Sequence, residues 1–300
     1  MTLSSPSRLI GADVLRQVKT IELRTRRLVN TLFSGEYRSV FRGQGMEFAE
    51  VRAYQHGDDY RSIDWNVSAR MASPYVKIFE EERELTLLLV VDRSGSEEFG
   101  NPVAKAERGV EVAAVLALAA ARQNDRAGAL IFSGRIDHVV PPRKGRRHAL
   151  RIIRDLVAFR PSDQRTNIAA ALAYAARLLR HRSIVVILSD FRAPGWEEPL
   201  RRLARRHEVV AVTVDDPREF ELPAAGWIEL RDAESGQRML VDTSHDATRL
   251  AVTMAAEKVR LARARAIKHA QVDHIALRTD KPYAEALHRA FAERARRLKR

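Results

Sequence analysis

An acid and two hydroxyls stand at alternate positions directly after a long apolar run. The run extends from Leu85 to Val91, and Asp92, Ser94 and Ser96 follow it. In an extended or loop backbone, alternate side chains point the same way, so these three oxygens can converge. Carboxylate and hydroxyl oxygens suit a hard cation such as Mg²⁺, with Mn²⁺ or Ca²⁺ as alternatives. The spacing therefore predicts a cation site.

Two further oxygen donors lie downstream in the sequence. Thr166 opens a predicted helix in "QRTNIAAAL", and Asp190 ends an apolar strand in "VILSDF". Water would complete the octahedron, because Mg²⁺ dehydrates reluctantly. In the alternative interpretation, Asp92, Ser94 and Thr166 only cap the helices that follow them. The predicted metal ligands are Asp92, Ser94, Ser96, Thr166 and Asp190.

The elements that must position these residues follow a regular order. From residue 85 onward, apolar strands alternate with amphipathic helices, which is typical of a mainly parallel sheet covered on both faces. Such doubly wound α/β sheets bind ligands at the carboxyl ends of their strands, where both predicted acids stand. The predicted strands are 85–91, 127–133, 135–141, 183–190 and 208–216, and the predicted helices are 102–123, 145–158, 167–180 and 197–206.

Different patterns flank this α/β region. A helical period covers 8–33, and period-two alternation between about 41 and 84 predicts a small β-rich element. A hairpin is predicted over 226–242, and the C-terminal segment reads as mostly helical with a candidate strand at "VDHIALR". The predicted domains are an N-terminal helix with the β-rich element (1–84), the α/β domain (85–245) and a mainly helical C-terminal segment (246–300).

The order of these motifs resembles two known families. D-x-S-x-S, a later Thr and a further Asp resemble the metal-ion-dependent adhesion site (MIDAS) of the von Willebrand factor A domain. The segment before it resembles the bacterial domain-of-unknown-function family fifty-eight. The resemblance runs from about residue 20 to the C-terminus and is most specific over 43–96. The matching residues are Gly43, Gly45, Glu47, Phe48, Arg52, Tyr54, Gly57, Asp58, Asp59, Arg61, Ile63, Asp64, Trp65, Ala69 and Arg70.

The resemblance implies a function as well as a fold. It implies a von Willebrand A-like domain that holds a metal, whose open position takes an Asp or Glu from a partner protein. Members of the family are typically encoded beside a MoxR-type AAA+ ATPase, which implies an adaptor of that ATPase in protein-complex maturation or chaperone-like work. Many members carry N-terminal transmembrane helices, and this sequence resembles the soluble subgroup.

Composition narrows the class of protein. The net charge is +13, with 52 basic against 39 acidic residues, and such a field favours acidic partners. Cysteine is absent, which excludes a disulfide framework, a thiolate zinc site and a cysteine nucleophile. We see neither a signal-peptide core nor about 18 uninterrupted apolar residues, so we expect a cytoplasmic protein without a membrane span.

The sequence predicts a binding protein rather than an enzyme. It has no Walker A pattern, no G-x-S-x-G elbow and no H-E-x-x-H pair. One alternative is a Mg²⁺-dependent phosphoryl hydrolase with Asp92 as nucleophile, although Ser94 stands where such enzymes place a second carboxylate. Another is a nucleic-acid-binding protein that uses the Arg-rich segments 24–27, 143–147 and 294–300.

The segment "GDDYRSIDWNVSAR" remains open between two roles. Its charged residues could form a network that holds the β-rich element to the main domain, since Arg pairs carboxylates bidentately. The alternative is a binding surface. The residues concerned are Asp58, Asp59, Arg61, Asp64 and Arg70.

Overall fold

The computed structural model describes residues 12–33, 47–80, 85–100, 102–161 and 163–298. The described parts of residues 1–40 and 86–300 form a larger unit, and those of residues 41–85 form a smaller one. Each unit is described by itself below.

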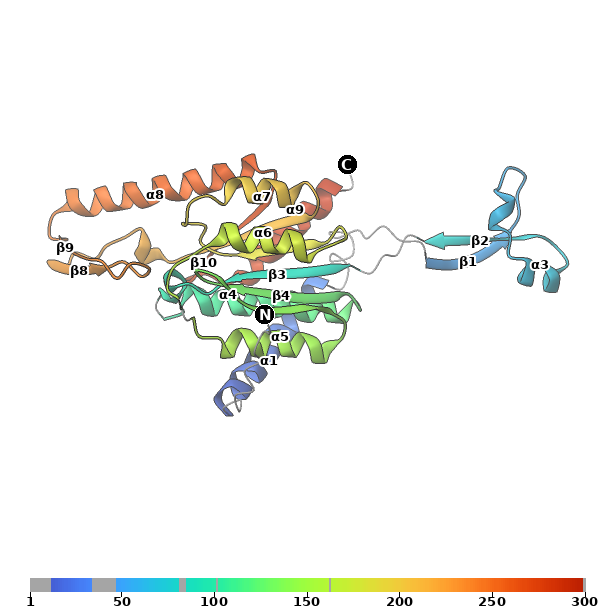
Figure 1. Ribbon diagram of the computed structural model, residues 1–300, viewed down its shortest axis with the longest axis horizontal. Coiled ribbons are helices and arrows are strands. Elements are labelled where there is room, and N and C mark those ends of the chain that lie inside the picture. Colours follow the sequence, from blue (N-terminus) through green and yellow to red (C-terminus); the bar gives the residue numbers. More distant parts are fainter. Residues whose placement is uncertain (1–11, 34–46, 81–84, 101, 162, 299–300) are drawn as a thin grey trace. The chain divides into compact units, whose positions relative to one another are not determined.

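The larger unit is built on a six-stranded sheet in the order β10-β7-β6-β3-β4-β5 (Figure 1). All neighbouring strands are parallel except β4 and β5, which are antiparallel. From β3 the chain adds β4 on one side and later β6 on the other, so the strand order switches between β3 and β6. The strands are β3 (Thr86–Asp92), β4 (Arg126–Phe132), β5 (Ile136–Arg143), β6 (Ile184–Leu188), β7 (Glu208–Asp215) and β10 (Asp273–Arg278).

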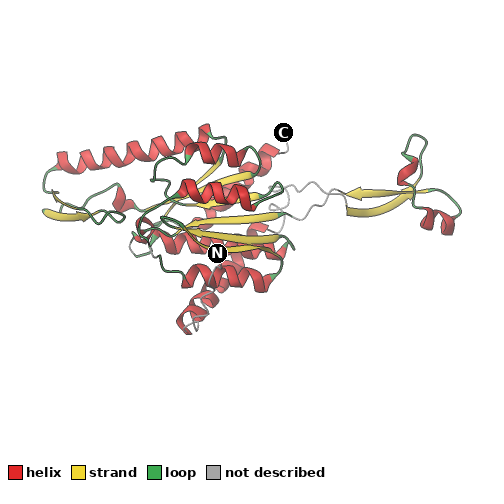
Figure 2. Ribbon diagram, in the orientation of Figure 1, coloured by secondary structure: helices red, strands yellow, loops and turns green. Residues whose placement is uncertain are grey.

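Helices cover both faces of this sheet, which confirms the predicted doubly wound α/β fold (Figure 2). Sheets of this type bind ligands at the carboxyl ends of the strands between which the order switches, here β3 and β6. The helices of the larger unit are α1 (Ala12–Phe33), α4 (Lys105–Arg122), α5 (Arg146–Ala158), α6 (Ile168–Leu178), α7 (Glu197–Ala204), α8 (Asp246–His269) and α9 (Tyr283–Leu298).

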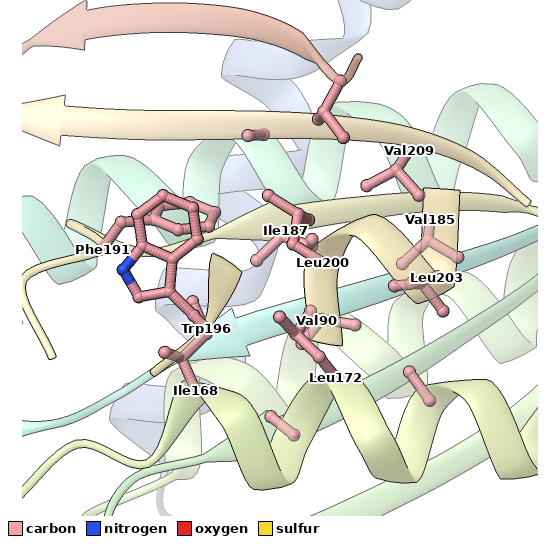
Figure 3. Packing of buried hydrophobic residues seen from close by; sticks show 14 of the residues in the cluster. Val90, Ile168, Leu172, Val185, Ile187, Phe191, Trp196, Leu200, Leu203 and Val209 are labelled. Carbon is pink, nitrogen blue, oxygen red and sulfur yellow. The ribbon is translucent and has the colours of Figure 1, made fainter. Parts of the chain in front are cut away.

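The hydrophobic core holds the strand ends in place. Val90 and Ile187, from adjacent strands, pack against Leu172 of α6 and Leu200 of α7 (Figure 3). Every residue from Leu87 to Asp92 is buried, as expected for a central strand covered on both faces. Each large apolar side chain in such a core stabilises the fold by roughly 1.5–3 kcal/mol. The rigid core therefore fixes the residues that follow β3 and β6.

The N-terminal helix and the C-terminal segment both belong to the larger unit. Helix α1 packs against α4 and α5 and buries Val18 and Val29, whereas the predicted division grouped this helix with the β-rich element. Strand β10 forms the edge of the sheet beside β7, so the segment 246–300 contributes to the same fold. The predicted start of the first helix, at residue 8, lies outside the described residues.

The smaller unit contains an antiparallel pair of strands, as the alternating pattern predicts. Arg52 donates two hydrogen bonds of 2.7 Å to Asp58, and Asp64 caps a short helix by accepting the N–H of Asn66 at 3.0 Å. These bonds are internal to the unit, and a role in holding it to the main domain stays a prediction. Its elements are β1 (Glu47–Ala53), a 3₁₀ turn (Tyr60–Ser62), α3 (Trp65–Met71) and β2 (Tyr75–Glu80).

A second antiparallel pair, strands β8 (Trp227–Arg231) and β9 (Arg238–Asp242), forms the predicted hairpin. Short 3₁₀ turns cover Gly95–Glu98 and Pro217–Glu219. Among the helices within the described ranges, we find none long and apolar enough to cross a membrane.

Candidate metal centre

Strand β3 ends at Asp92, and both carboxylate oxygens of this residue accept hydrogen bonds. Oδ1 accepts the backbone N–H of Ser94 at 3.0 Å, and Oδ2 accepts the hydroxyl of Ser189 at 2.6 Å. Asp92 is 2% exposed and Ser94 is fully buried. The hydroxyl oxygens of Ser94 and Ser96 lie 3.3 Å apart. The loop therefore gathers the three oxygen-bearing side chains that the sequence places at alternate positions.

Strand β6 brings Asp190 to the same place. One carboxylate oxygen from each of Asp92, Glu97 and Asp190 lies within 4.8 Å of the other two, and all three residues are buried. The backbone N–H of Asp190 also donates to Oε1 of Glu97 at 3.0 Å. Since β3 and β6 are neighbours in the sheet, their end residues meet as predicted for strand-end acids.

A buried lysine balances part of this negative charge. Lys105 opens α4, and its fully buried ammonium lies 3.1 Å from Oδ2 of Asp190 and 2.9 Å from Oε1 of Glu219. Arg192 adds a second cation, 3.2 Å from the same oxygen of Glu219. Both basic groups therefore form ion pairs with Asp190 and Glu219, and neither pairs with Asp92.

The electrostatics of the two strand-end acids consequently differ. Burial, together with the charge of Asp190, raises the pKa of Asp92 to about 7. Burial also tends to raise the pKa of Asp190, but the charges of Lys105 and Arg192 outweigh this effect and hold the pKa of that carboxyl below its usual value. Burial raises the pKa of Glu97 well above its usual value against the attraction of Lys105. No basic group in the described part of the chain forms an ion pair with Asp92.

Thr166 lies on the loop next to this cluster. The carbonyl of Gln164 accepts the N–H of Gly95 at 2.8 Å, which ties the two loops together. The hydroxyl of Thr166 itself donates to Oε1 of Glu234 at 2.6 Å. It does not cap the next helix, because Asn167 does so by accepting the N–H of Ala170 at 3.0 Å. The capping alternative is therefore wrong for Thr166.

The capping alternative also fails for Ser94. Ser94 stands at the start of the short 3₁₀ turn, but its side chain makes no capping hydrogen bond there. The hydroxyls after β3 are thus placed without a capping role.

Backbone strain marks the end of β6. Phe191 has φ +54°, a left-handed conformation that costs a bulky residue on the order of 1 kcal/mol or more. Its ring is 3% exposed and meets Trp196 edge-on, with ring centroids 5.0 Å apart (Figure 3). Core packing of this ring therefore enforces the turn, in which the N–H of Arg192 donates to Oδ1 of Asp190 at 3.1 Å.

The structure adds site residues that sequence reasoning missed. Glu97 stands next to the recognised motif, and Lys105 is one of few lysines in a chain whose basic residues are mostly arginine. The position of Glu97 beside the motif and the rarity of lysine could have pointed to these two residues. The other added residues have no such feature in the sequence around them. The added residues are Glu97, Lys105, Ser189, Glu219 and Glu234.

The donor set fits a hard divalent cation. It offers carboxylate and hydroxyl oxygens and no soft ligand, which matches the preference of Mg²⁺, Mn²⁺ and Ca²⁺. A buried carboxylate that lacks a cationic partner is costly, and a bound cation would remove that cost. The residues that would hold it are Asp92, Ser94 and Ser96, with Thr166 and Asp190 as further direct or water-mediated donors.

Sequence comparisons agree with the resemblance. The model of the family described as "Protein of unknown function DUF58" matches residues 50–262. The uncharacterized protein Rv1480 of Mycobacterium tuberculosis is 37% identical over 284 residues, covering 93% of this chain and 89% of that protein. The uncharacterized protein YeaD of Bacillus subtilis is 32% identical over 108 residues, 36% of this chain and 25% of YeaD.

The solved structures that match this chain include two of low sequence identity. BatB from Bacteroides thetaiotaomicron has a TM-score of 0.45 at 16% identity, covering 71% of this chain and 99% of that one. The SpRpn10 VWA domain has a TM-score of 0.41 at 10% identity, covering 68% and 94%. Because the family model spans more than half of the sequence, this chain belongs to the DUF58 family.

Proposed function

We propose that this protein is a metal-dependent adaptor that binds an acidic side chain of a partner protein. One observation carries the proposal: Asp92 is buried at the switch point of the sheet, beside two hydroxyls and without a basic partner among the described residues. A Mg²⁺ ion, or Mn²⁺ or Ca²⁺, is the cation that such oxygens would take. When bound, the metal would supply a positive centre for the carboxylate of a partner.

The protein's own residues prepare the site in two ways. Ser189 and the N–H of Ser94 fix the orientation of Asp92, so its oxygens need no rearrangement. Lys105 holds Asp190 through an ion pair at 3.1 Å, which keeps the second acid close without leaving both charges unbalanced. Because Lys105 already pairs with Asp190 and no basic group among the described residues pairs with Asp92, the arrangement supports a single cation bound beside Asp92.

The partner is proposed from the family and from charge. The resemblance implies a MoxR-type AAA+ ATPase as one partner, with a client protein that offers an Asp or Glu, in protein-complex maturation or chaperone-like work. The net charge of +13 supports capture of an acidic surface, since complementary charge speeds association. Co-purification of the tagged chain with that ATPase, at physiological salt, tests the partnership directly.

The metal dependence has its own experiment. We expect the chain to bind Mn²⁺ in isothermal titration, and Asp92→Asn to abolish the binding. Asp246→Asn serves as the control, because that side chain is 92% exposed at the start of α8. The same variants are then used to retain the partner with and without EDTA. Retention that is indifferent to both EDTA and Asp92→Asn would sink the proposal.

The two alternative functions receive less support. Residue 94 is a serine, so the loop after β3 lacks the second carboxylate that a phosphoryl-accepting aspartate of the D-x-D type uses as its acid–base partner. Phosphatase turnover that disappears on Asp92→Asn would reverse this preference. The Arg-rich segments bind acids of the same chain: Arg24 lies 3.6 Å from Glu111, and Arg294 lies 2.7 Å from Glu208. Steeply salt-dependent DNA affinity would revive that option.

A further inference from the structure

The tip of the β8–β9 hairpin is a preformed turn that presents an acid. Oδ1 of Asp232 accepts the N–H groups of Glu234 at 3.2 Å and Ser235 at 2.6 Å, and also the Ser235 hydroxyl at 2.7 Å. Gly236 adopts φ +73°, which favours glycine, and donates its N–H to the carbonyl of Asp232 at 3.0 Å. These bonds fix the turn and leave the side chain of Glu234 free to point away from it.

This turn rests on the loops of the candidate metal centre. Oε1 of Glu234 accepts the hydroxyl of Thr166 at 2.6 Å, and Thr166 is one of the predicted metal ligands. The carbonyl oxygen of Ala233 lies so close to Gly95 that a Cβ there would be 2.5 Å from it. Gly95 stands between Ser94 and Ser96, so the hairpin touches the D-x-S-x-S loop where only a glycine leaves room.

The body of the hairpin is held much more loosely than its tip. Neither β8 nor β9 contains a buried residue, and Trp227, Met239 and Leu240 are exposed. The base is closed by Thr243, which is fully buried and donates its hydroxyl to the carbonyl of Gly226 at 2.7 Å. A two-stranded hairpin with so little buried surface is marginally stable alone, so the tip contacts decide its position.

We propose that Glu234 is a built-in acidic ligand of the candidate metal centre. The inference rests on the proposed function, because it concerns what completes that site before a partner arrives. The carboxylate of Glu234 takes the place that an acid of the partner would take, and binding of the partner requires the hairpin tip to leave.

Two substitutions on the same hairpin separate this role from a structural one. Glu234→Gln keeps an oxygen that can accept the Thr166 hydroxyl but removes the charge. Glu229→Gln is the matched control, because Glu229 pairs with Arg238 at 3.1 Å on the strands of the hairpin. We expect Mn²⁺ affinity, measured by titration of the full chain, to fall about tenfold for Glu234→Gln and to stay unchanged for Glu229→Gln, since ligand charge tunes affinity.

Hydrogen exchange gives a second measurement that does not depend on affinity. Amides over 232–237 should exchange at least several-fold more slowly with Mn²⁺ than with EDTA, and this protection should be lost in Glu234→Gln. Mn²⁺ binding that needs Asp92 but ignores Glu234→Gln, with unchanged exchange at the tip, would overturn this inference alone. Mn²⁺ binding that is absent, or indifferent to Asp92→Asn, would overturn the proposed function and this inference with it.

Discussion

Two acids end parallel strands of the same sheet, and the chain treats them differently. Asp92 ends β3 and Asp215 ends β7, and they are 2% and 5% exposed. Asp215 receives two hydrogen bonds from the guanidinium of Arg263, at 2.9 and 2.7 Å. Asp92 receives hydrogen bonds from the hydroxyl of Ser189 and from Ser94, all of them from uncharged groups. Arg263 therefore neutralises Asp215, whereas no basic side chain in the described part of the chain pairs with Asp92.

The difference shows what distinguishes a structural acid from a candidate ligand. A strand-end position alone does not, since both acids have it. The decisive property is whether the protein itself neutralises the buried charge. By that criterion Asp215 and Arg263 form a structural ion pair, whereas Asp92 is a candidate ligand for a bound cation.

The largest expected effect comes from breaking the scaffold pair. Arg263→Ala leaves Asp215 buried without its cation and removes the 2.8 Å bond to the carbonyl of Asp190. We expect the free energy of unfolding in urea to fall by about 3–5 kcal/mol. Arg260→Ala, one turn away in a half-exposed pair with Glu257, should cost less than about 1 kcal/mol. Similar losses for both variants would contradict the distinction.

The second expected effect is a pH dependence of the free energy of unfolding that comes from His274, near the Asp215–Arg263 pair. Burial and the charge of Arg263 lower the pKa of His274 to about 4, and its ring bonds Thr213 at 3.0 Å. The unfolded chain, with a pKa near 6.5, therefore binds more protons between pH 6.5 and 4. This stability is complete above about pH 6.5 and is lost as the pH falls toward 4. His274 alone should contribute a loss of about 3 kcal/mol, while the raised pKa of Asp92 acts in the opposite direction over the same window.

Urea unfolding at several pH values between 4 and 7 measures this loss. His274→Gln should remove the part of this dependence that comes from His274, so the difference between its stability curve and that of the wild type isolates that contribution. His181→Gln is the control, since His181 is exposed, and it should leave the slope unchanged. An unchanged slope in His274→Gln would assign the pH dependence to another group.

A third experiment compares the two acids directly. In EDTA, Asp215→Asn should destabilise the fold by about 3 kcal/mol, because it leaves Arg263 without its acid. Asp92→Asn should cost less than about 1 kcal/mol, because it removes a buried charge that has no cation. With Mn²⁺ at 100 times its dissociation constant, the wild type should gain about 2.7 kcal/mol and Asp92→Asn nothing. Equal losses in EDTA would refute the comparison.

The sequence predicts the sheet because its signals are local. The apolar runs 85–91 and 183–190 predict the buried central strands β3 (86–92) and β6 (184–188), and Asp92 and Asp190 meet at one edge of the sheet. The grouping of α1 was harder to predict. Its periodicity identifies a buried face without saying which helices cover that face.

The charge pairs of the site escape sequence reasoning for a physical reason. Lys105 meets Asp190 and Glu219 across 85 and 114 positions, and Thr166 meets Glu234 across 68. These contacts depend on how loops from different strands converge once the sheet has formed. A single loop residue carries no period from which such a partner could be inferred.

The smallest expected change in stability comes from disturbing the contact between the hairpin tip and the Asp92 loop. Arg263 of the core pairs with the scaffold acid Asp215, whereas the hairpin tip contacts the Asp92 loop at Gly95. Gly95→Ala would bring a Cβ within 2.5 Å of both the Ala233 carbonyl and the side-chain oxygen of Gln164, and we expect the loosely held tip to shift. Because the hairpin buries little, we expect a loss of about 1 kcal/mol or less and several-fold faster amide exchange over 232–237.

The control for this last prediction is a second glycine with open space around it. Gly109 lies within α4, and a Cβ there would meet nothing within 4 Å. Gly109→Ala should therefore stabilise the fold by about 0.5–1 kcal/mol and leave exchange at the tip unchanged. If Gly95→Ala leaves that exchange unchanged too, the tip does not rest on the D-x-S-x-S loop. Faster exchange in Gly95→Ala alone would locate the contact at the D-x-S-x-S loop.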